Sequence, residues 1–203
     1  EPLKQYPYFI KPPEKYIKDD VLVEILFVNS GELSKGGIKT DDKFTPYVFN
    51  DEKLVGIGWA ILGGAKCDDS VRVALNLISR EQVDKIAFVG VTGNLMLWID
   101  GNDIGERNKN FIRNSLGDDF EIAWEMAQRI ISEHPEKAIL PVDVAVESNG
   151  KRTPLSIDDL PTDNPIYDVG IETLKSLKPL VQNAGCILWN GPASYFELPE
   201  FAF

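Results

Sequence analysis

The sequence predicts an α/β protein in which helices cover both faces of a parallel sheet, after a small N-terminal segment with a β-hairpin. Between residues 58 and 192, short apolar runs typical of buried strands alternate with longer stretches of helical periodicity. Several apolar runs end in glycine, as strands do where the chain turns sharply into a helix. The chain has 203 residues and is 43% hydrophobic, enough to bury a sizeable core. Together these observations indicate a Rossmann-like sheet.

The N-terminal residues 1–57 are expected to form a unit of their own, followed by an α/β unit over residues 58–203. Four prolines within residues 1–20 oppose regular structure, so this stretch is expected to be an extended arm. The run VLVEILFV, residues 21–28, is strongly β-prone. Two further β-prone runs flank a polar turn at residues 50–51 and predict a hairpin.

The helices are predicted by their local patterns. The stretch DDSVRVALNLISRE begins with two acidic residues that favour a helix N-terminus, and its apolar residues recur at helical spacing. Gly185 follows a second amphipathic stretch and is suited to end its helix. The expected helices cover residues 68–81, 91–101, part of 103–119, 119–134 and 171–184.

The strands of the α/β unit are predicted from short apolar runs. The run DKIAFVG ends in Gly90, as expected of a buried strand. Pro141 interrupts the run KAILPVDVAVES, so that strand is expected to bend or pair weakly there. The polar stretch 149–164 is expected to be a loop. The expected strands cover residues 54–62, 84–90, 137–148, 165–170 and 186–192.

The net negative charge limits the classes of partner that the protein is expected to bind. The formal net charge is -11 and the pI is about 4.6. Nucleic acids and anionic membrane surfaces need clustered Lys and Arg, so neither is expected as a partner. No segment reaches the roughly 20 apolar residues of a membrane span, and no signal peptide is recognisable at the N-terminus. We therefore expect a cytoplasmic protein.

Cysteine and histidine are scarce. Cys67 and Cys186 lie far apart, outside any CxxC motif or Cys/His cluster, so no metal site is predicted. Free thiols in a reducing compartment are expected, with one disulfide as the alternative. The only histidine, His134, precedes a proline at a predicted helix end. This position indicates a surface or capping role and argues against Ser–His or Cys–His catalysis.

Ligands of parallel α/β sheets bind beyond the carboxyl ends of the strands. In this chain those ends read GGAK, VGVTGN, VDVAVE, DVG and WNGP, and they are rich in glycine and polar residues. Lys66 of GGAK stands between a glycine turn and a helix start, where a phosphate is a suitable ligand. A solvated lysine at a βα turn is the alternative.

These strand ends, in this order, resemble the nucleotide-binding C-terminal domain of phosphoglycerate kinase, especially its archaeal form. The resemblance extends from Ala60 to about Phe203. The pair LGGAK and WNGP, the latter followed closely by FE, makes it specific. The matching stretches are ILGGAKCDDSV, DKIAFVGVTGNLML, ERNKNFI, AILPVDVAVESNGK, DDLPTDNPIYDVGIETL and CILWNGPASYFE.

The resemblance implies a glycolytic phosphotransferase that binds ADP or ATP with Mg²⁺. Lys66 would meet the phosphates and the transferring phosphoryl group, where positioning and positive charge supply most of the catalysis. Gly63 and Gly64 would let the backbone approach the nucleotide. The remaining implied contacts are Gly90 beside the adenine, Asn190, Gly191 and Pro192 in the turn that lines the pocket, and Glu197 on the ribose.

The sequence departs from the family pattern at several points. Val89 stands where an adjacent glycine is expected, Ile171 and Glu172 stand where proline and lysine are common, and the GPASYFE turn is bulkier. The family's glycine-rich phosphate turn is expected beyond Phe203, and its substrate domain does not resemble residues 1–57. We therefore expect a fragment with incomplete catalytic elements. Its partner 3-phosphoglycerate is expected only where a substrate domain is supplied.

Alternatives stay open for function and for single residues. The chain is a phosphoglycerate kinase-like domain, a nucleotide-binding module without turnover, or a composite structural protein without a ligand. Asp143 and Asp168, each at a strand end, have structural hydrogen bonding and Mg²⁺ binding as alternatives. For Glu197, an exposed acid near the terminus is the alternative to a ribose contact.

Overall fold

A computed structural model describes residues 9–18, 21–28, 49–50, 53–54, 57–184 and 187–202, with side chains from residue 58 onward. The chain divides into two units, Glu1–Thr45 and Pro46–Phe203. The division expected at residue 57 from the sequence stays a prediction.

In the first unit, β1 (Phe9–Lys18) and β2 (Val21–Val28) pair in an antiparallel sheet. The prediction of β2 is confirmed, whereas the prediction of an arm over residues 1–20 is wrong for β1. Its two prolines, Pro12 and Pro13, lie where the register shifts between Lys11 and Glu14. Two missing N–H donors are therefore accommodated at an irregularity of the strand.

The second unit begins with a short hairpin. β3 (Phe49–Asn50) pairs with β4 (Lys53–Leu54) in antiparallel register, which confirms the centre of the predicted hairpin. The next strand, β5 (Ile57–Leu62), was expected to be part of the second strand of this hairpin. It instead pairs in parallel with two strands that follow later in the chain.

A four-stranded parallel sheet forms the centre of the second unit, as predicted. Its order is β11-β5-β6-β7, so that β5 and β6 are the inner strands. In the register, Trp59 of β5 is paired with Lys85 of β6 and with Ile187 of β11. The three strands beside β5 are β6 (Val83–Phe88), β7 (Ala138–Ile139) and β11 (Ile187–Asn190).

Five α-helices connect the described strands, and four of them confirm predicted helices. The polar stretch after residue 103, expected to be partly helical, contains the fifth, α4. None of the described helices is long and apolar enough to cross a membrane. The helices are α2 (Cys67–Ser79), α3 (Gly90–Ile99), α4 (Glu106–Leu116), α5 (Phe120–Glu133) and α6 (Ile171–Asn183).

A second sheet is antiparallel and corrects three predictions. It consists of β8 (Asp143–Ser148), β9 (Lys151–Ser156) and β10 (Ile166–Val169) in the order β10-β8-β9. The stretch 149–164 was expected to be a loop, but it contains β9. The strand expected at 165–170 in the parallel sheet is β10, which pairs antiparallel with β8. The single strand expected over residues 137–148 is also wrong, because the chain forms two strands there, β7 in the parallel sheet and β8 in the antiparallel sheet, with Pro141 between them.

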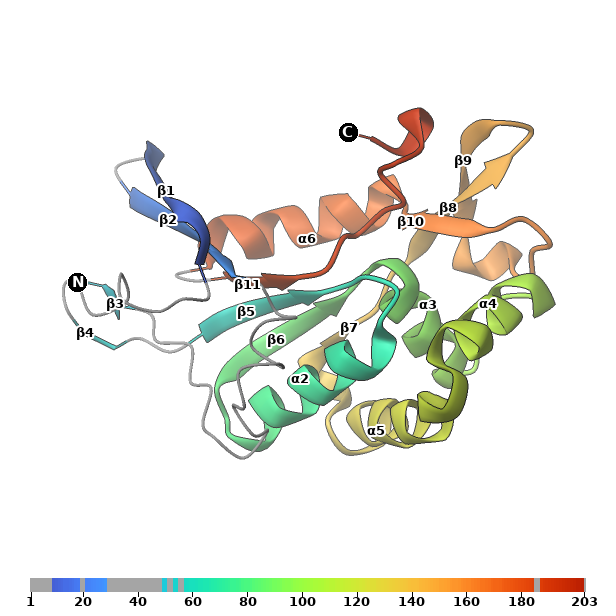
Figure 1. Ribbon diagram of the computed structural model, residues 1–203, viewed down its shortest axis with the longest axis horizontal. Helices are drawn as coiled ribbons and strands as arrows, with labels where there is room; N and C mark the ends of the chain where they lie inside the picture. Colours follow the sequence, from blue (N-terminus) through green and yellow to red (C-terminus); the bar gives the residue numbers. More distant parts are fainter. Residues whose placement is uncertain are drawn as a thin grey trace. The chain divides into compact units, whose positions relative to one another are not determined.

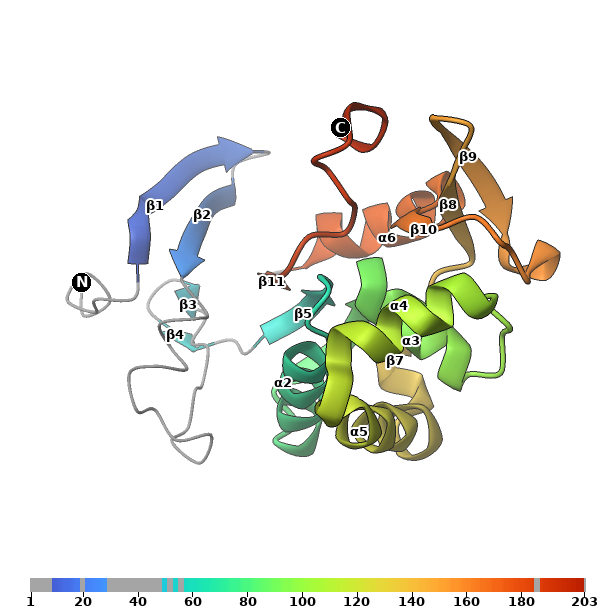
Figure 2. The ribbon, with the colours of Figure 1, turned by 45° about the vertical axis from the view of Figure 1, so that its right-hand side comes forward.

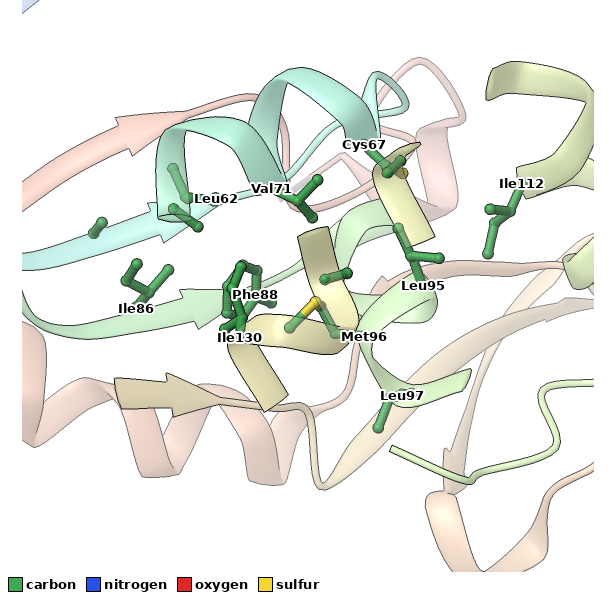
Figure 3. Close-up of a cluster of buried hydrophobic side chains, with 14 of the residues drawn as sticks. Leu62, Cys67, Val71, Ile86, Phe88, Leu95, Met96, Leu97, Ile112 and Ile130 are labelled. Carbon is green, nitrogen blue, oxygen red and sulfur yellow. The ribbon is translucent and has the colours of Figure 1, made fainter. Parts of the chain in front are cut away.

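Side chains of the inner strands alternate between two faces of the parallel sheet. Ala60, Leu62, Ile86 and Phe88 pack against α2, α3 and α5 in the larger buried cluster, part of which Figure 3 shows. Ile61, Ala87 and Val89 pack on the opposite face, with Leu177 of α6. In Figures 1 and 2, α2 and α5 accordingly lie on one side of the sheet and α6 on the other. Helices on both faces were predicted from the alternation of elements.

Candidate functional site

Most of the residues predicted to be functional gather at one edge of the parallel sheet. The strands β5, β6 and β11 run in the same direction, so the turns that follow them lie at the same edge. These turns are residues 63–66, 89–90 and 191–193. The predicted strand ends VDVAVE and DVG belong to β8 and β10 of the antiparallel sheet, so they are not ends of parallel strands.

Backbone hydrogen bonds join these turns. The N–H of Gly63 donates to the carbonyl of Asn190 at 2.8 Å, and the N–H of Gly64 donates to the carbonyl of Pro192 at 2.8 Å. At the end of β6, the N–H of Val89 donates to the carbonyl of Leu62 at 2.9 Å. The glycine turn that leads to Lys66 is therefore bonded directly to the turn that follows β11.

Two glycines are required by the close approach of the turns. Gly191 has a φ of +78°, and a Cβ at this position would overlap the carbonyl oxygen of Gly63. Gly90 has a φ of +56°, and a Cβ there would lie 2.8 Å from the carbonyl oxygen of Pro192. Contact between turns thus accounts for both glycines. Their expected role beside a nucleotide stays a prediction.

Three side chains that sequence reasoning missed bind the carbonyls of residues 63–65. The Ser70 hydroxyl donates to Gly63 at 3.0 Å, the Thr92 hydroxyl to Gly64 at 3.2 Å, and the Cys67 thiol to Ala65 at 3.7 Å. All three donors are buried. The available signal was their place in the first turns of α2 and α3, directly after the glycine turns.

Lys66 lies at the end of this turn as the N-cap residue of α2. It is exposed to solvent. Its side chain makes no hydrogen bond and no ion pair with the residues that the structure describes. Its ammonium group is therefore available to an anion at this edge of the sheet.

The N-termini of α2 and α3 add to this positive environment. Neither N-cap residue, Lys66 or Val89, forms a side-chain cap hydrogen bond. The first N–H groups of a helix without a side-chain cap attract anions, because they are unpaired and carry partial positive charge. Asp68 and Asp69 occupy the first turn of α2, but the first turn of α3 has no acidic residue. The start of α3 is the more favourable of the two for an anion.

The N-terminus of α6 differs, because the buried Asp143 carboxylate closes it. Asp143 Oδ2 accepts the N–H of Glu172 at 3.0 Å, and Oδ1 accepts both the N–H and the hydroxyl of Thr173 at 2.7 Å. The Thr173 hydroxyl also accepts the N–H of Val142 at 3.0 Å. Asp143 therefore has the structural hydrogen-bonding role, which ties the start of β8 to α6.

Asp168 forms a second structural contact, between the outer strands of the antiparallel sheet. Arg152 Nη2 on β9 donates to Asp168 Oδ2 on β10 at 3.2 Å and to the carbonyl of Val169 at 2.8 Å. Burial raises the pKa of the Asp168 carboxyl above its ordinary value, and the Arg152 hydrogen bond counteracts this shift. This ion pair braces β9 against β10.

Glu197 lies in a segment that is anchored to β10. The N–H of Tyr195 donates to the carbonyl of Tyr167 at 2.9 Å. The rings of Tyr195 and Phe201 pack edge-on against the ring of Tyr167, with centroids 5.1 Å and 5.5 Å away. Glu197 itself is exposed and bonds to none of the described side chains. Its ribose contact stays a prediction.

The described cysteine and histidine do not form a catalytic pair. Burial raises the pKa of the Cys67 thiol to about 12, so at neutral pH it is a protonated donor and not a nucleophile. Cys67 is a free thiol, and Cys186 lies outside the described residues. His134 ends α5 as its C-cap residue. Within residues 58–184 and 187–202, no three His, Cys, Asp or Glu side chains are grouped to hold a metal.

Known proteins match the chain over most of its length. A family model described as phosphoglycerate kinase matches residues 52–203. The phosphoglycerate kinase of Methanocorpusculum labreanum is 40% identical over 142 residues, which are 70% of this chain and 34% of that protein. The phosphoglycerate kinase of Thermoplasma acidophilum is 35% identical over 143 residues, which are 70% of this chain and 35% of that protein.

Solved structures agree with these sequence relatives. The crystal structure of phosphoglycerate kinase from Pyrococcus horikoshii OT3 has a TM-score of 0.64 and 30% identity, over 72% of this chain and 36% of that chain. The chain spans about a third of the length of the relatives it matches. The resemblance predicted from the strand ends is confirmed: this chain belongs to the phosphoglycerate kinase family.

Proposed function

We propose that this chain binds ADP or ATP with Mg²⁺ at the carboxyl edge of the parallel sheet. The observation that carries the proposal is the exposed Lys66 beside the N-termini of α2 and α3, which have no side-chain caps. Positive charge and free N–H groups at one point suit a di- or triphosphate. Membership of a kinase family supports a nucleotide as the carrier of those phosphates.

The proposed contacts follow the order of the turns. Lys66 and the first N–H groups of α3 bind the phosphates, with Gly63 and Gly64 as the turn that carries Lys66. Gly90 leaves space beside the adenine. Asn190, Gly191 and Pro192 line the pocket, and Glu197 accepts from the ribose hydroxyls. Of these residues, Glu197 has the least support, because its segment is bonded to β10 and not to the turn that carries Lys66.

The proposed Mg²⁺ ion would be held mainly by the nucleotide. Mg²⁺ keeps several waters and takes few carboxylates when it is bound with phosphates. The described side chains offer no group of three carboxylate, His or Cys ligands, which is consistent with an ion that arrives on the nucleotide. Bound in this way, Mg²⁺ would neutralise part of the phosphate charge that Lys66 faces.

The complete family reaction, phosphoryl transfer between ATP and 3-phosphoglycerate, is proposed only for a chain that is supplied with a substrate domain. Transfer requires the two reactants to be held in line, and that orientation provides much of the rate. The match covers about a third of the relatives. Binding without turnover is therefore the function proposed for this chain alone.

Calorimetric titration with Mg-ADP tests the proposal. We expect micromolar binding that Lys66→Ala weakens by about tenfold or more, since a charge-assisted hydrogen bond is lost. Lys178→Ala, an exposed lysine about two turns into α6, is the matched control and should leave the affinity unchanged. No heat at millimolar nucleotide would show that the chain is a structural protein without this ligand. A coupled assay with 3-phosphoglycerate would reveal turnover and contradict binding alone.

A further inference from the structure

The turn before Lys66 is bonded from two sides. On one side, the N–H groups of Gly63 and Gly64 donate to the carbonyls of Asn190 and Pro192. On the other side, the Ser70 and Thr92 hydroxyls donate to the carbonyls of the same two glycines. All four backbone polar groups of the two glycines are therefore paired. A flexible dipeptide is held in one conformation by bonds to two helices and to one turn.

The direction of the two carbonyls follows from the burial of their donors. Ser70 is 2% exposed and Thr92 is 0% exposed. A carbonyl that accepts from a buried hydroxyl has its oxygen turned toward the protein interior. The oxygens of Gly63 and Gly64 consequently point away from the solvent side, on which Lys66 is exposed.

This direction matters for an anion that binds at Lys66. A carbonyl oxygen carries partial negative charge, and it would repel a phosphate if it faced the same space. Holding two such dipoles inward before the ligand arrives avoids a reorganisation cost at the moment of binding. Thr92 belongs to the first helical turn of α3, so its hydroxyl also ties the Lys66 turn to the other proposed phosphate-binding element.

We propose, on the basis of the proposed nucleotide binding, that Ser70 and Thr92 are positioning residues for Lys66. Their buried hydroxyls hold the glycine carbonyls inward and fix where the Lys66 side chain leaves the turn. They act on the diphosphate through Lys66 and make no contact with the nucleoside. A positioning role therefore affects the binding of the diphosphate but not that of the nucleoside, whereas a general role in stability would affect both.

The first experiment compares two ligands, Mg-ADP and adenosine, by calorimetry. Thr92→Val keeps the shape of the side chain and removes its hydroxyl, and Ser70→Ala does the same for Ser70. Each variant should weaken Mg-ADP binding by about threefold to tenfold, the effect of one neutral hydrogen bond. Adenosine binding should change by less than about twofold. Thr92→Ser restores the hydroxyl and should restore the Mg-ADP affinity.

The second experiment is a double-mutant cycle with Lys66→Met. If Thr92 acts through Lys66, Thr92→Val should no longer change the Mg-ADP affinity once the ammonium group is removed. Equal effects of Thr92→Val in both backgrounds would overturn the inference. So would equal weakening of Mg-ADP and adenosine, because that result indicates a general loss of structure.

Folding is checked by the urea unfolding curve of each variant. If Thr92→Val does not fold, the double-mutant cycle with Lys66→Met is measured with Ser70→Ala in its place. If the unaltered chain binds no Mg-ADP, the proposed function and this inference both fail. If it binds Mg-ADP and Lys66→Met weakens that binding, but neither hydroxyl is coupled to Lys66, only this inference fails.

Discussion

The two faces of the parallel sheet are built from the same strands but are covered very differently. On the face with α2, α3 and α5, Leu62, Ile86 and Phe88 are at most 1% exposed. On the opposite face, α6 is the helix of the smaller cluster. There Trp189 on the edge strand β11 is 63% exposed and Leu174 of α6 is 44% exposed. Ile61 and Ala87 of the inner strands are still buried on that face, at 8% and 1%, so among the described residues it is open only at the edge strand and over the outer side of α6.

The candidate site belongs to the closed face. Ser70 and Thr92 lie on the first turns of α2 and α3, whose other residues form the larger cluster. The turn that carries Lys66 is therefore held in part by two helices of the larger buried cluster. On the open face, the Asp143 carboxylate holds the N-terminus of α6. The difference predicts that substitutions on the two faces have unequal costs.

The largest difference is expected between two buried leucines. Leu95→Ala in α3 should lower the free energy of unfolding by about 3–5 kcal/mol, because this 0% exposed side chain would leave a cavity in a closed core. Leu177→Ala in α6, which is 7% exposed, should cost only about 2 kcal/mol, since a helix covered on one side can settle inward. Urea unfolding curves of the two variants measure both costs. Equal losses would contradict the contrast between the faces.

The apolar runs and helical spacings that predicted the parallel sheet and its helices did not predict the antiparallel sheet. The apolar runs in β8 and β10 look like those of buried parallel strands, and an apolar run carries no information about the direction of pairing. β9 was missed because Lys151, Arg152 and Pro154 are not typical of a strand. Pro154 is tolerated because β9 is an edge strand. The dipeptide Asn149–Gly150, at φ of 53° and 77°, was the overlooked hairpin signal.

The candidate site, like the fold, was predictable from the sequence only in its local features. Lys66 and its glycines follow from the strand-end pattern, because that pattern is local. The bonds from Ser70 and Thr92 to the glycine carbonyls, and from Asp143 to Thr173, are different. The bonds of Thr92 and Asp143 join residues 28 and 30 positions apart. Such pairs depend on how elements pack, so a local pattern can place Thr92 at a helix start but does not give its partner.

The second prediction concerns the attachment of α6. Asp143→Ala should lower the free energy of unfolding by about 2 kcal/mol, because it leaves the buried N–H group of Thr173 and the partly buried N–H group of Glu172 without an acceptor. Asp163→Ala, which removes an exposed acid, is the matched control and should change little. Chemical denaturation at pH 7 compares them. If Asp143→Ala costs as little as Asp163→Ala, the Asp143 carboxylate does not stabilise the attachment of α6.

The third prediction uses the Cys67 thiol to probe the closed face at high pH. Its pKa is raised to about 12 in the folded protein from 9.0, so the thiol contributes stability below pH 9 that is lost as the pH rises toward 12. At pH 10 the loss is on the order of 1 kcal/mol. Cys67→Ala cannot show this loss, so the difference between the two unfolding curves should shrink between pH 8 and pH 10. A constant difference would mean that the folded thiol ionises freely.

The smallest effect on stability is expected for a substitution on the open face. This substitution tests whether the apolar residues of α6 are exposed to solvent in solution. Ile171, Leu174 and Val181 recur at helical spacing on α6 and are 50%, 44% and 40% exposed. Leu174→Gln keeps helix propensity and should change the free energy of unfolding by less than about 0.5 kcal/mol. Exposed apolar stripes beside an edge strand promote association, so sedimentation should show less self-association for this variant at high concentration. A cost near that of Leu177→Ala would instead mean that another part of the chain covers α6, and the contrast between the two faces would disappear.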